Sequence, residues 1–203
     1  MTKTKLAVIF YSMKGTNYKL ALWAAEAAKE VGAEIRVLKV AENVPQEVID
    51  SQPAWKATAE ATKSIKVATP DDLVWADAII FSSPTHFGNA SSQIRQFIDQ
   101  LGGIWFQGKL ANKSVSAMAT AQNAQGGQVQ TILGLYTTFY HWGAIVAAPG
   151  YTDPVVYEAG GCPYGVSVTV GQNGEILGDE LSVKNAVKHQ TLRTIEIATK
   201  LNS

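Results

Sequence analysis

Five short apolar runs, separated by stretches with helical periodicity, restrict the possible folds of this chain more than any other feature. Four of the runs are apolar on both faces, which is typical of strands in a parallel sheet covered by helices. The second run differs because Glu34, Arg36 and Lys39 interrupt it, as charged residues do in an edge strand. The runs lie at residues 6–11, 33–40, 77–83, 114–121 and 143–149.

Between these runs, apolar residues recur every three or four positions, which predicts amphipathic helices. The predicted stripes are Leu20, Ala24, Ala27, Ala28 and Val31; Ile94, Phe97, Ile98 and Leu101; Val129, Ile132, Leu133 and Tyr136; and Val183, Val187, Ile195 and Ala198 in a last helix from near Ser182. Because strands and helices alternate, we expect right-handed crossovers and a doubly wound α/β sheet. The length fits one domain over residues 1–203.

Two segments are longer than such a fold requires. Residues 41–69 and 149–180 lie between predicted elements and are rich in proline or glycine. Segments of this length are usually functional or interfacial. We expect them to be insertions within the single domain.

Composition excludes several classes of partner. Lys plus Arg and Asp plus Glu each total 17, so the net charge is zero and offers no general attraction for nucleic acid or anionic lipid. No apolar stretch reaches the roughly 18 residues of a membrane span. The single cysteine, Cys162, cannot form an intrachain disulfide. We therefore expect a soluble, cytoplasmic protein without nucleic-acid or membrane partners.

The loop after the first strand has the composition of an anion site. Ligands of open α/β sheets lie beyond the carboxyl ends of the strands, at the switch point of strand order. Ser12, Thr16 and Asn17 offer side-chain donors, Gly15 lets the backbone approach closely, and the following helix start has unpaired N–H groups. Lys14 could add a cation or point to solvent. A phosphate-binding loop and a simple helix N-cap both explain these residues.

The loop at 82–93 suits a flat heteroaromatic ring with polar edges. Thr85, His86 and Asn89 can form hydrogen bonds, and Phe87 offers an aromatic face. An ordinary turn followed by a serine cap would use similar residues.

The loop at 119–128 follows another predicted strand end. Its amides and Gly126–Gly127 could bring backbone N–H groups to an anionic or carbonyl-rich ring edge. A flexible connection is the alternative for this loop alone, but three polar loops at successive strand ends favour a binding site.

No metal site or catalytic side chain is predicted. The three histidines, His86, His141 and His189, do not pair at helical spacing, and there is no Cys/His cluster. Neither a Ser-His-Asp triad nor paired carboxylates are evident. On spacing alone, His141 is a capping or core residue and Trp105 a core or interface aromatic.

Four segments, taken in order and spacing, resemble a known family. "YSMKGTN", "SPTHFGNASSQIRQFIDQLGGIW", "GGQVQT" and "TTFYHWG" are similar to the WrbA-type NAD(P)H:quinone oxidoreductases, and the resemblance runs from about Lys5 to Leu201. It implies a flavodoxin-like three-layer sandwich with a five-stranded parallel sheet in the order 2-1-3-4-5. It also implies FMN as cofactor, NADH or NADPH and a quinone as substrates, and a homotetramer.

The resemblance assigns roles to individual residues. The cofactor-binding set would be Ser12, Met13, Lys14, Gly15, Thr16 and Asn17 for the phosphate; Pro84, Thr85, His86, Phe87, Gly88 and Asn89 for the ring and ribityl chain; and Thr120, Ala121, Gln122, Asn123, Gln125 and Gly126 for the pyrimidine edge. His141 would reach the flavin from a neighbouring subunit, and Trp105 would lie beside the substrate. The chain departs from the family at Lys14, usually aromatic, at His86, usually arginine, and in its longer third loop.

The expected function is two-electron reduction of quinones to hydroquinones, protective against redox stress. A flavodoxin-like electron shuttle without its own NAD(P)H turnover is the alternative, although such shuttles usually carry an acidic surface and this chain is neutral. A signalling receiver domain would need acids where the chain has Tyr11–Ser12 and Ser82–Ser83. A nucleic-acid-binding module has little support from the charge balance.

Overall fold

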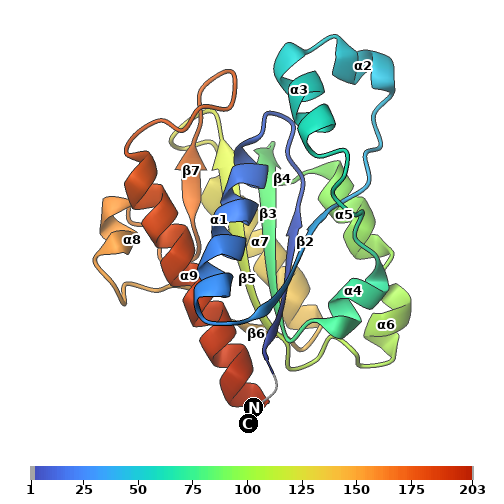
Figure 1. Ribbon diagram of the computed structural model, residues 1–203, viewed down its shortest axis with the longest axis vertical. Coiled ribbons are helices and arrows are strands. Elements are labelled where there is room, and N and C mark those ends of the chain that lie inside the picture. The colour runs from blue at the N-terminus through green and yellow to red at the C-terminus, as the bar shows by residue number, and fades with distance from the viewer. Residues whose placement is uncertain (1–2, 203) are drawn as a thin grey trace.

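The computed structural model describes residues 3–202 as a parallel sheet with helices on both faces (Figure 1). The main strands are β1 (Lys5–Phe10), β2 (Glu34–Lys39), β3 (Ala78–His86), β5 (Ser114–Ala121) and β6 (Ile145–Val146). They are paired in the order β2-β1-β3-β5-β6, and each of these pairs is parallel. Since these strands are the five predicted runs, the predicted order 2-1-3-4-5 is confirmed, with the charged second run at an edge.

Helices on the two faces enclose separate cores. One face is covered by α1 (Thr16–Glu30) and α9 (Glu180–Leu201), and the other by α5 (Ser92–Asp99) and α7 (Gln128–His141). The side chains of β1 alternate between them: Val8 packs beneath α1 and α9, and Ile9 packs on the opposite face. No helix within residues 3–202 combines the length and apolarity needed to cross a bilayer.

Three stripe residues were predicted wrongly. Val31, Val129 and Leu133 are 55%, 40% and 36% exposed. Val31 is the C-cap of α1, where the helical face no longer meets the sheet. In α7 the buried face instead carries Leu135 and Phe139, together with the predicted Ile132 and Tyr136.

The predicted fifth strand is split. β6 pairs only with the first two residues of β5, and β7 (Ser167–Thr169) takes the same side of β5 further along, opposite Ala119–Ala121. Residues 147–166 leave the sheet between them and include α8 (Val155–Glu158). After β6 the Ala147 N–H still donates to the Val115 carbonyl (2.8 Å), and Pro149, which has no N–H, cannot add a further ladder bond.

A buried amide secures the return of the chain to the sheet. Gln190 on α9 accepts a hydrogen bond from the Val166 N–H (2.7 Å) and donates to Ser116 Oγ (3.1 Å) and the Ala117 carbonyl (3.0 Å). Gly165 is required there, because a Cβ at this position would lie 2.2 Å from the Ala117 carbonyl oxygen. This anchoring places the segment that follows β7 at the carboxyl end of the sheet.

The long segment at 41–69 is helical rather than a loop. It forms α2 (Gln46–Asp50) and α3 (Pro53–Ala61) beyond the sheet, and α4 (Pro70–Trp75) follows (Figure 1). Pro53 is the first residue of α3, a position that does not need an N–H. Ile49 and Trp55 are buried in the same core as the sheet residues. The remaining short elements are β4 (Asn89–Ala90) and α6 (Gly102–Phe106).

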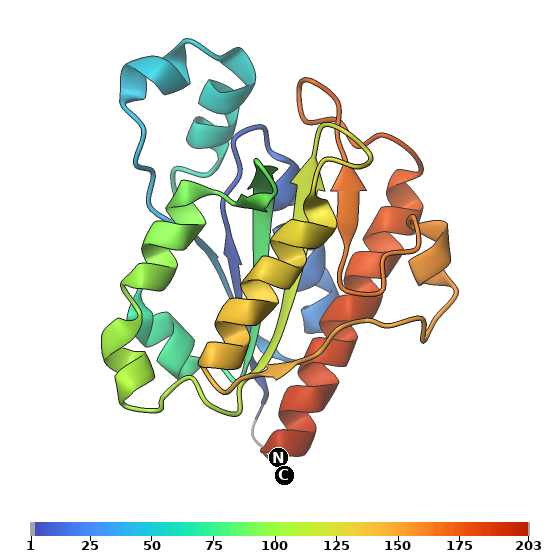
Figure 2. The ribbon, with the colours of Figure 1, turned by 180° about the vertical axis from the view of Figure 1, so that it is seen from behind.

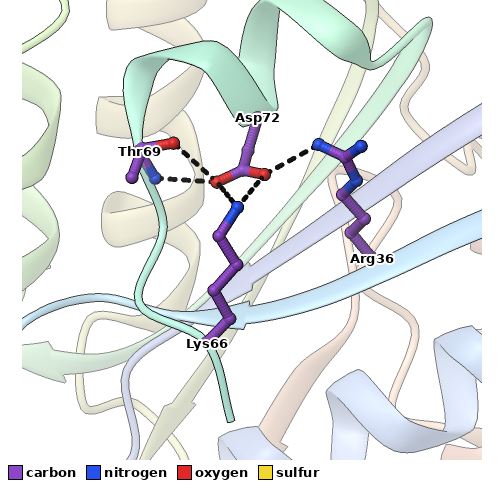
Figure 3. A network of polar contacts seen from close by, with 4 residues as sticks. All are labelled: Arg36, Lys66, Thr69 and Asp72. Atoms are coloured by element: carbon purple, nitrogen blue, oxygen red, sulfur yellow. Dashed lines mark hydrogen bonds and ion pairs between the residues drawn. The ribbon is translucent and has the colours of Figure 1, made fainter.

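One buried carboxylate joins the edge strand to the start of α4 (Figure 3). The Asp72 side chain is 1% exposed and accepts hydrogen bonds from Arg36 (2.9 Å) and Lys66 (2.8 Å). It also accepts from the backbone N–H and hydroxyl of Thr69, which completes a capping box. The Arg36 guanidinium in turn lies 3.9 Å from the centre of the Trp75 ring. Burial alone raises the pKa of Asp72, but the bonds from Lys66, Thr69 and Arg36 outweigh it, so the pKa lies below its usual value.

We expect Asp72→Asn to lower the free energy of unfolding by about 2 kcal/mol at neutral pH, because charge-assisted hydrogen bonds are lost. The folded-state pKa of Asp72 lies below that of the unfolded chain, so the ionised carboxylate stabilises the fold above about pH 4. This contribution is lost as the pH falls through the folded-state pKa. The difference between the two proteins in urea unfolding should therefore shrink below pH 4. The exposed neighbour Asp71→Asn is the control, and an equal effect of both substitutions would contradict the prediction.

Candidate functional site

A cavity of about 340 Å³ lies beyond the carboxyl ends of β1, β3 and β5. Because the chain order reverses between β1 and β3, this is the switch point of the sheet. The cavity is lined by Ser12, Met13, Lys14, Thr16, Asn17, Gln52, Pro84, Thr85, His86, Thr120, Ala121, Gln122, Asn123, Gly126, Val170 and Gly174. The three polar loops singled out in the sequence therefore meet at one place, and most of their predicted residues line it.

The first loop is not a conventional side-chain cap. Gly15 is the N-cap of α1 with a left-handed φ of 88°, and no side chain caps the helix at that position. The hydroxyl of Ser12 is buried and has no hydrogen-bond partner within residues 3–202. Unpaired N–H groups and a free hydroxyl at a helix start form an anion-binding cradle. The geometry therefore favours the anion-site interpretation over the simple cap.

Two side chains predicted as donors in this loop are already engaged. Asn17 donates from Nδ2 to Thr120 Oγ1 (2.9 Å) and accepts from Ser82 Oγ (2.9 Å), so it joins α1 to β5 and β3. Thr16 donates from its hydroxyl to the Gly174 carbonyl. Both residues line the cavity, but their side chains bond to protein. Ser12 is the predicted side-chain donor of this loop that remains available.

The second loop contributes Pro84, Thr85 and His86. The Thr85 hydroxyl is buried without a partner in the described part of the chain. Burial lowers the pKa of His86 below its usual range, so the imidazole is neutral at neutral pH. A neutral imidazole can donate from one nitrogen and accept at the other. This wall can therefore present hydrogen-bonding groups without charge.

Three predicted residues of the second loop lie outside the cavity lining. Phe87 is fully exposed and has a φ of 50°, because it stands at the tip of the hairpin between β3 and β4. Asn89 donates from Nδ2 to the Phe87 carbonyl (3.1 Å) and so holds the turn. Gly88 lies against Gly127, where an added Cβ would be 2.9 Å from the Gly88 Cα. The tight hairpin therefore carries these residues away from the cavity.

The third loop brings Thr120, Ala121, Gln122, Asn123 and Gly126 to the lining. A Cβ on Gly126 would lie 2.7 Å from the Ala121 Cβ, so the loop folds back closely on the end of β5. The turn is held by a hydrogen bond from Gln128 Nε2 to the Asn123 carbonyl (2.8 Å). The predicted Gln125 is exposed and lies outside the lining.

Three lining residues were not predicted from the sequence. Gln52 lies between α2 and α3, and Val170 and Gly174 follow β7. All three belong to the two segments that were recognised as unusually long. Their length was the available signal, but it did not indicate which residues return to the cavity.

His141 and Trp105 lie together at the other end of the sheet. α7 begins beside the cavity and runs to the opposite end, where it ends at His141 near α6 (Figure 2). Trp105 donates from Nε1 to the His141 carbonyl (2.7 Å). Within one chain, neither side chain reaches the cavity.

The charged groups of the cavity lining are the next feature that restricts its ligand. Among the described residues that line it, Lys14 is the one with a full charge at neutral pH, and there is no carboxylate. The described residues also contain no group of three His, Cys, Asp or Glu side chains that could hold a metal ion. The lining is therefore suited to an anionic or neutral organic ligand.

Comparisons with known proteins identify the family to which the chain is similar. Residues 4–152 match the family described as NADPH-dependent FMN reductase. The chain is 54% identical to an NAD(P)H dehydrogenase (quinone) of Deinococcus radiodurans, covering 97% of this chain and 96% of that protein. It is 40% identical to one of Rhizobium rhizogenes, covering 97% and 98%.

Solved structures support the fold. A WrbA-like flavodoxin from Agrobacterium tumefaciens superposes with a TM-score of 0.56 at 18% identity, covering 98% of each chain. Oxidised flavodoxin 2 from Bacillus cereus gives 0.61 at 15% identity, covering 95% of this chain and 99% of that one. At these identities the likeness concerns the fold, which is flavodoxin-like.

Proposed function

The chain belongs to the NADPH-dependent FMN reductase family, and from this premise we propose that it is an FMN-dependent NAD(P)H:quinone oxidoreductase. The relatives that share its whole length are named for this activity. The observation that carries the proposal is the cavity at the switch point of the sheet, with an uncapped helix start at one end and free hydroxyls in its walls.

The residues present fit FMN. The hydroxyl of Ser12 and the N–H groups at the start of α1 would hold the phosphate, because they are unpartnered donors in a cradle without a carboxylate. The free hydroxyl of Thr85 and the neutral imidazole of His86 would border the ring and ribityl chain. The third loop, closed by Gly126, would present backbone groups and amides to the polar edge of the ring.

FMN, when bound, supplies the two-electron redox chemistry between NADH or NADPH and the quinone. The contribution of the protein is position and environment. The bond network of Asn17 with Ser82 and Thr120 fixes the loops relative to each other. Pro84 adds apolar surface to the wall of the site, and the neutral His86 adds hydrogen bonds without a charge.

We infer that His141 and Trp105 act on a neighbouring subunit, in a homotetramer. Both lie far from the cavity of their own chain and could reach one only across an interface. Aromatic surface supports such an interface: Trp105, Phe106 and Tyr140 are 48%, 86% and 64% exposed at this end. Phe87, fully exposed at the tip of the β3–β4 hairpin and outside the cavity lining, adds aromatic surface at the other end of the sheet. We also propose that the protein is cytoplasmic and that residues 1–203 form a single domain.

A flavodoxin-like electron shuttle is the second candidate. It is less favoured because the chain has no net charge, whereas shuttles dock through acidic surfaces, and because the relatives are named as dehydrogenases. Turnover with NADH or NADPH in the absence of a partner protein separates the two.

The test is a steady-state assay of the purified holoprotein. We expect oxidation of NADH or NADPH when benzoquinone is supplied, a visible flavin spectrum, and release of FMN rather than FAD on heating. A flavin-loaded protein that oxidises neither nucleotide would favour the shuttle, and a protein that takes up no FMN would reject both candidates.

A further inference from the structure

A small hairpin that follows β7 lies against the first loop at the carboxyl end of the sheet (Figure 1). Val170 and Ile176 pair as an antiparallel bridge, and residues 171–175 form the tip. The Gly171 N–H donates to the Glu175 carbonyl (2.7 Å), and the Gly174 N–H donates to the Gly171 carbonyl (3.1 Å). The tip is therefore a closed turn with its own hydrogen bonds.

Two donors of the first loop end on carbonyl oxygens of this tip. Lys14 Nζ donates to the Gln172 carbonyl (2.5 Å), and the Thr16 hydroxyl donates to the Gly174 carbonyl. The backbones also touch: a Cβ on Gly174 would lie 2.2 Å from the Lys14 carbonyl oxygen, and Gly174 has a φ of 92°. Glycine at 174 is thus what allows the tip to sit so close to the loop.

The contact between the tip and the first loop involves the charged side chain of the site. Lys14 and Gly174 both line the cavity, and Lys14 is the fully charged residue among its described lining. An ammonium group has three N–H donors, so the bond to Gln172 leaves capacity for a phosphate oxygen. The bond also restricts a long, flexible side chain that would otherwise extend into solvent.

We propose that the hairpin at 170–176 holds Lys14 as the charge-recognising group of the site, which makes the site select a flavin with a phosphate over one without it. The inference rests on the proposed function and names a specificity determinant within it. A phosphate dianion gains Coulomb energy from a fixed ammonium, whereas riboflavin, which lacks the phosphate, gains none. Because the attraction is electrostatic, it is weakened by salt.

The test compares FMN and riboflavin binding to the apoprotein by quenching of flavin fluorescence. We expect Lys14→Met to weaken FMN binding about tenfold, the effect of losing one partly solvated charge pair, and to change riboflavin binding less than twofold. The salt dependence of FMN binding should fall, and Lys14→Arg should restore most of the preference. Lys19→Met is the matched control, since Lys19 pairs with Glu180 on the surface.

A second variant tests the hairpin. Gly174→Ala must push the tip away from the loop, so it should reduce the preference for FMN over riboflavin in the same direction as Lys14→Met, with the fold checked by its melting temperature. The inference is overturned if Lys14→Met changes both flavins equally or neither, or if folded Gly174→Ala keeps the wild-type preference. A wild-type apoprotein that binds neither flavin would instead reject the proposed function.

Discussion

Ser12→Asp is expected to give a folded, colourless protein whose affinity for FMN is lower by roughly a thousandfold. The Ser12 hydroxyl is buried, unpartnered in the described chain and part of the cavity lining. A carboxylate at this position would face the phosphate dianion. Two like charges about 4 Å apart near a protein surface repel by about 4 kcal/mol, which corresponds to about three orders of magnitude in affinity.

The measurement is flavin content after purification, followed by titration of the apoprotein with FMN. Ser12→Ala should have a milder effect, about tenfold to a hundredfold, because it removes one hydrogen bond to a charged group. The exposed Ser64→Asp is the matched control for adding a carboxylate and should bind FMN normally. Wild-type affinity in folded Ser12→Asp would show that this loop does not hold the phosphate.

The strands were predictable because their pattern is local. The strand residues Leu6–Phe10 are buried on both faces of the sheet, and an uninterrupted apolar run is the sequence pattern that such a strand requires. The split of the fifth strand was not predictable, because β7 replaces the end of β6 through contacts made by Gln190, far away in the chain. The helices of the 41–69 segment were missed because their apolar contacts, such as that of Trp55, are few and widely spaced.

The candidate site was predictable where residues lie next to a strand end. Ser12 lies two residues after β1, and Thr85 and Thr120 are the penultimate residues of β3 and β5, so the rule for parallel sheets places them at the cavity. Gln52 and Gly174 come from insertions whose path depends on tertiary packing. Whether a side-chain donor is free to bind a ligand also depends on the tertiary structure. In the sequence Asn17 is a candidate donor to a ligand, but in the fold its side chain forms hydrogen bonds with Ser82 and Thr120.

Substitution of His141 tests whether the site is completed across subunits. The side chain is exposed, and its contact with Trp105 uses the backbone carbonyl, so His141→Ala should leave the fold and FMN binding intact. If His141 donates a hydrogen bond in a neighbouring site, its loss should lower kcat by about a hundredfold, as removal of a positioned donor does in other enzymes.

Mixed oligomers then distinguish a contribution in trans from one in cis. Ser12→Asp chains keep His141 but no FMN, and His141→Ala chains keep FMN. Co-expression should restore about a quarter of wild-type activity, because half of the chains keep a cavity and half of those border an intact His141. His141→Ala chains mixed with the double variant should show no gain, since no intact His141 is then present. If the first mixture only averages its two components, His141 does not act across the interface, and the cavity must complete its chemistry with residues of its own chain.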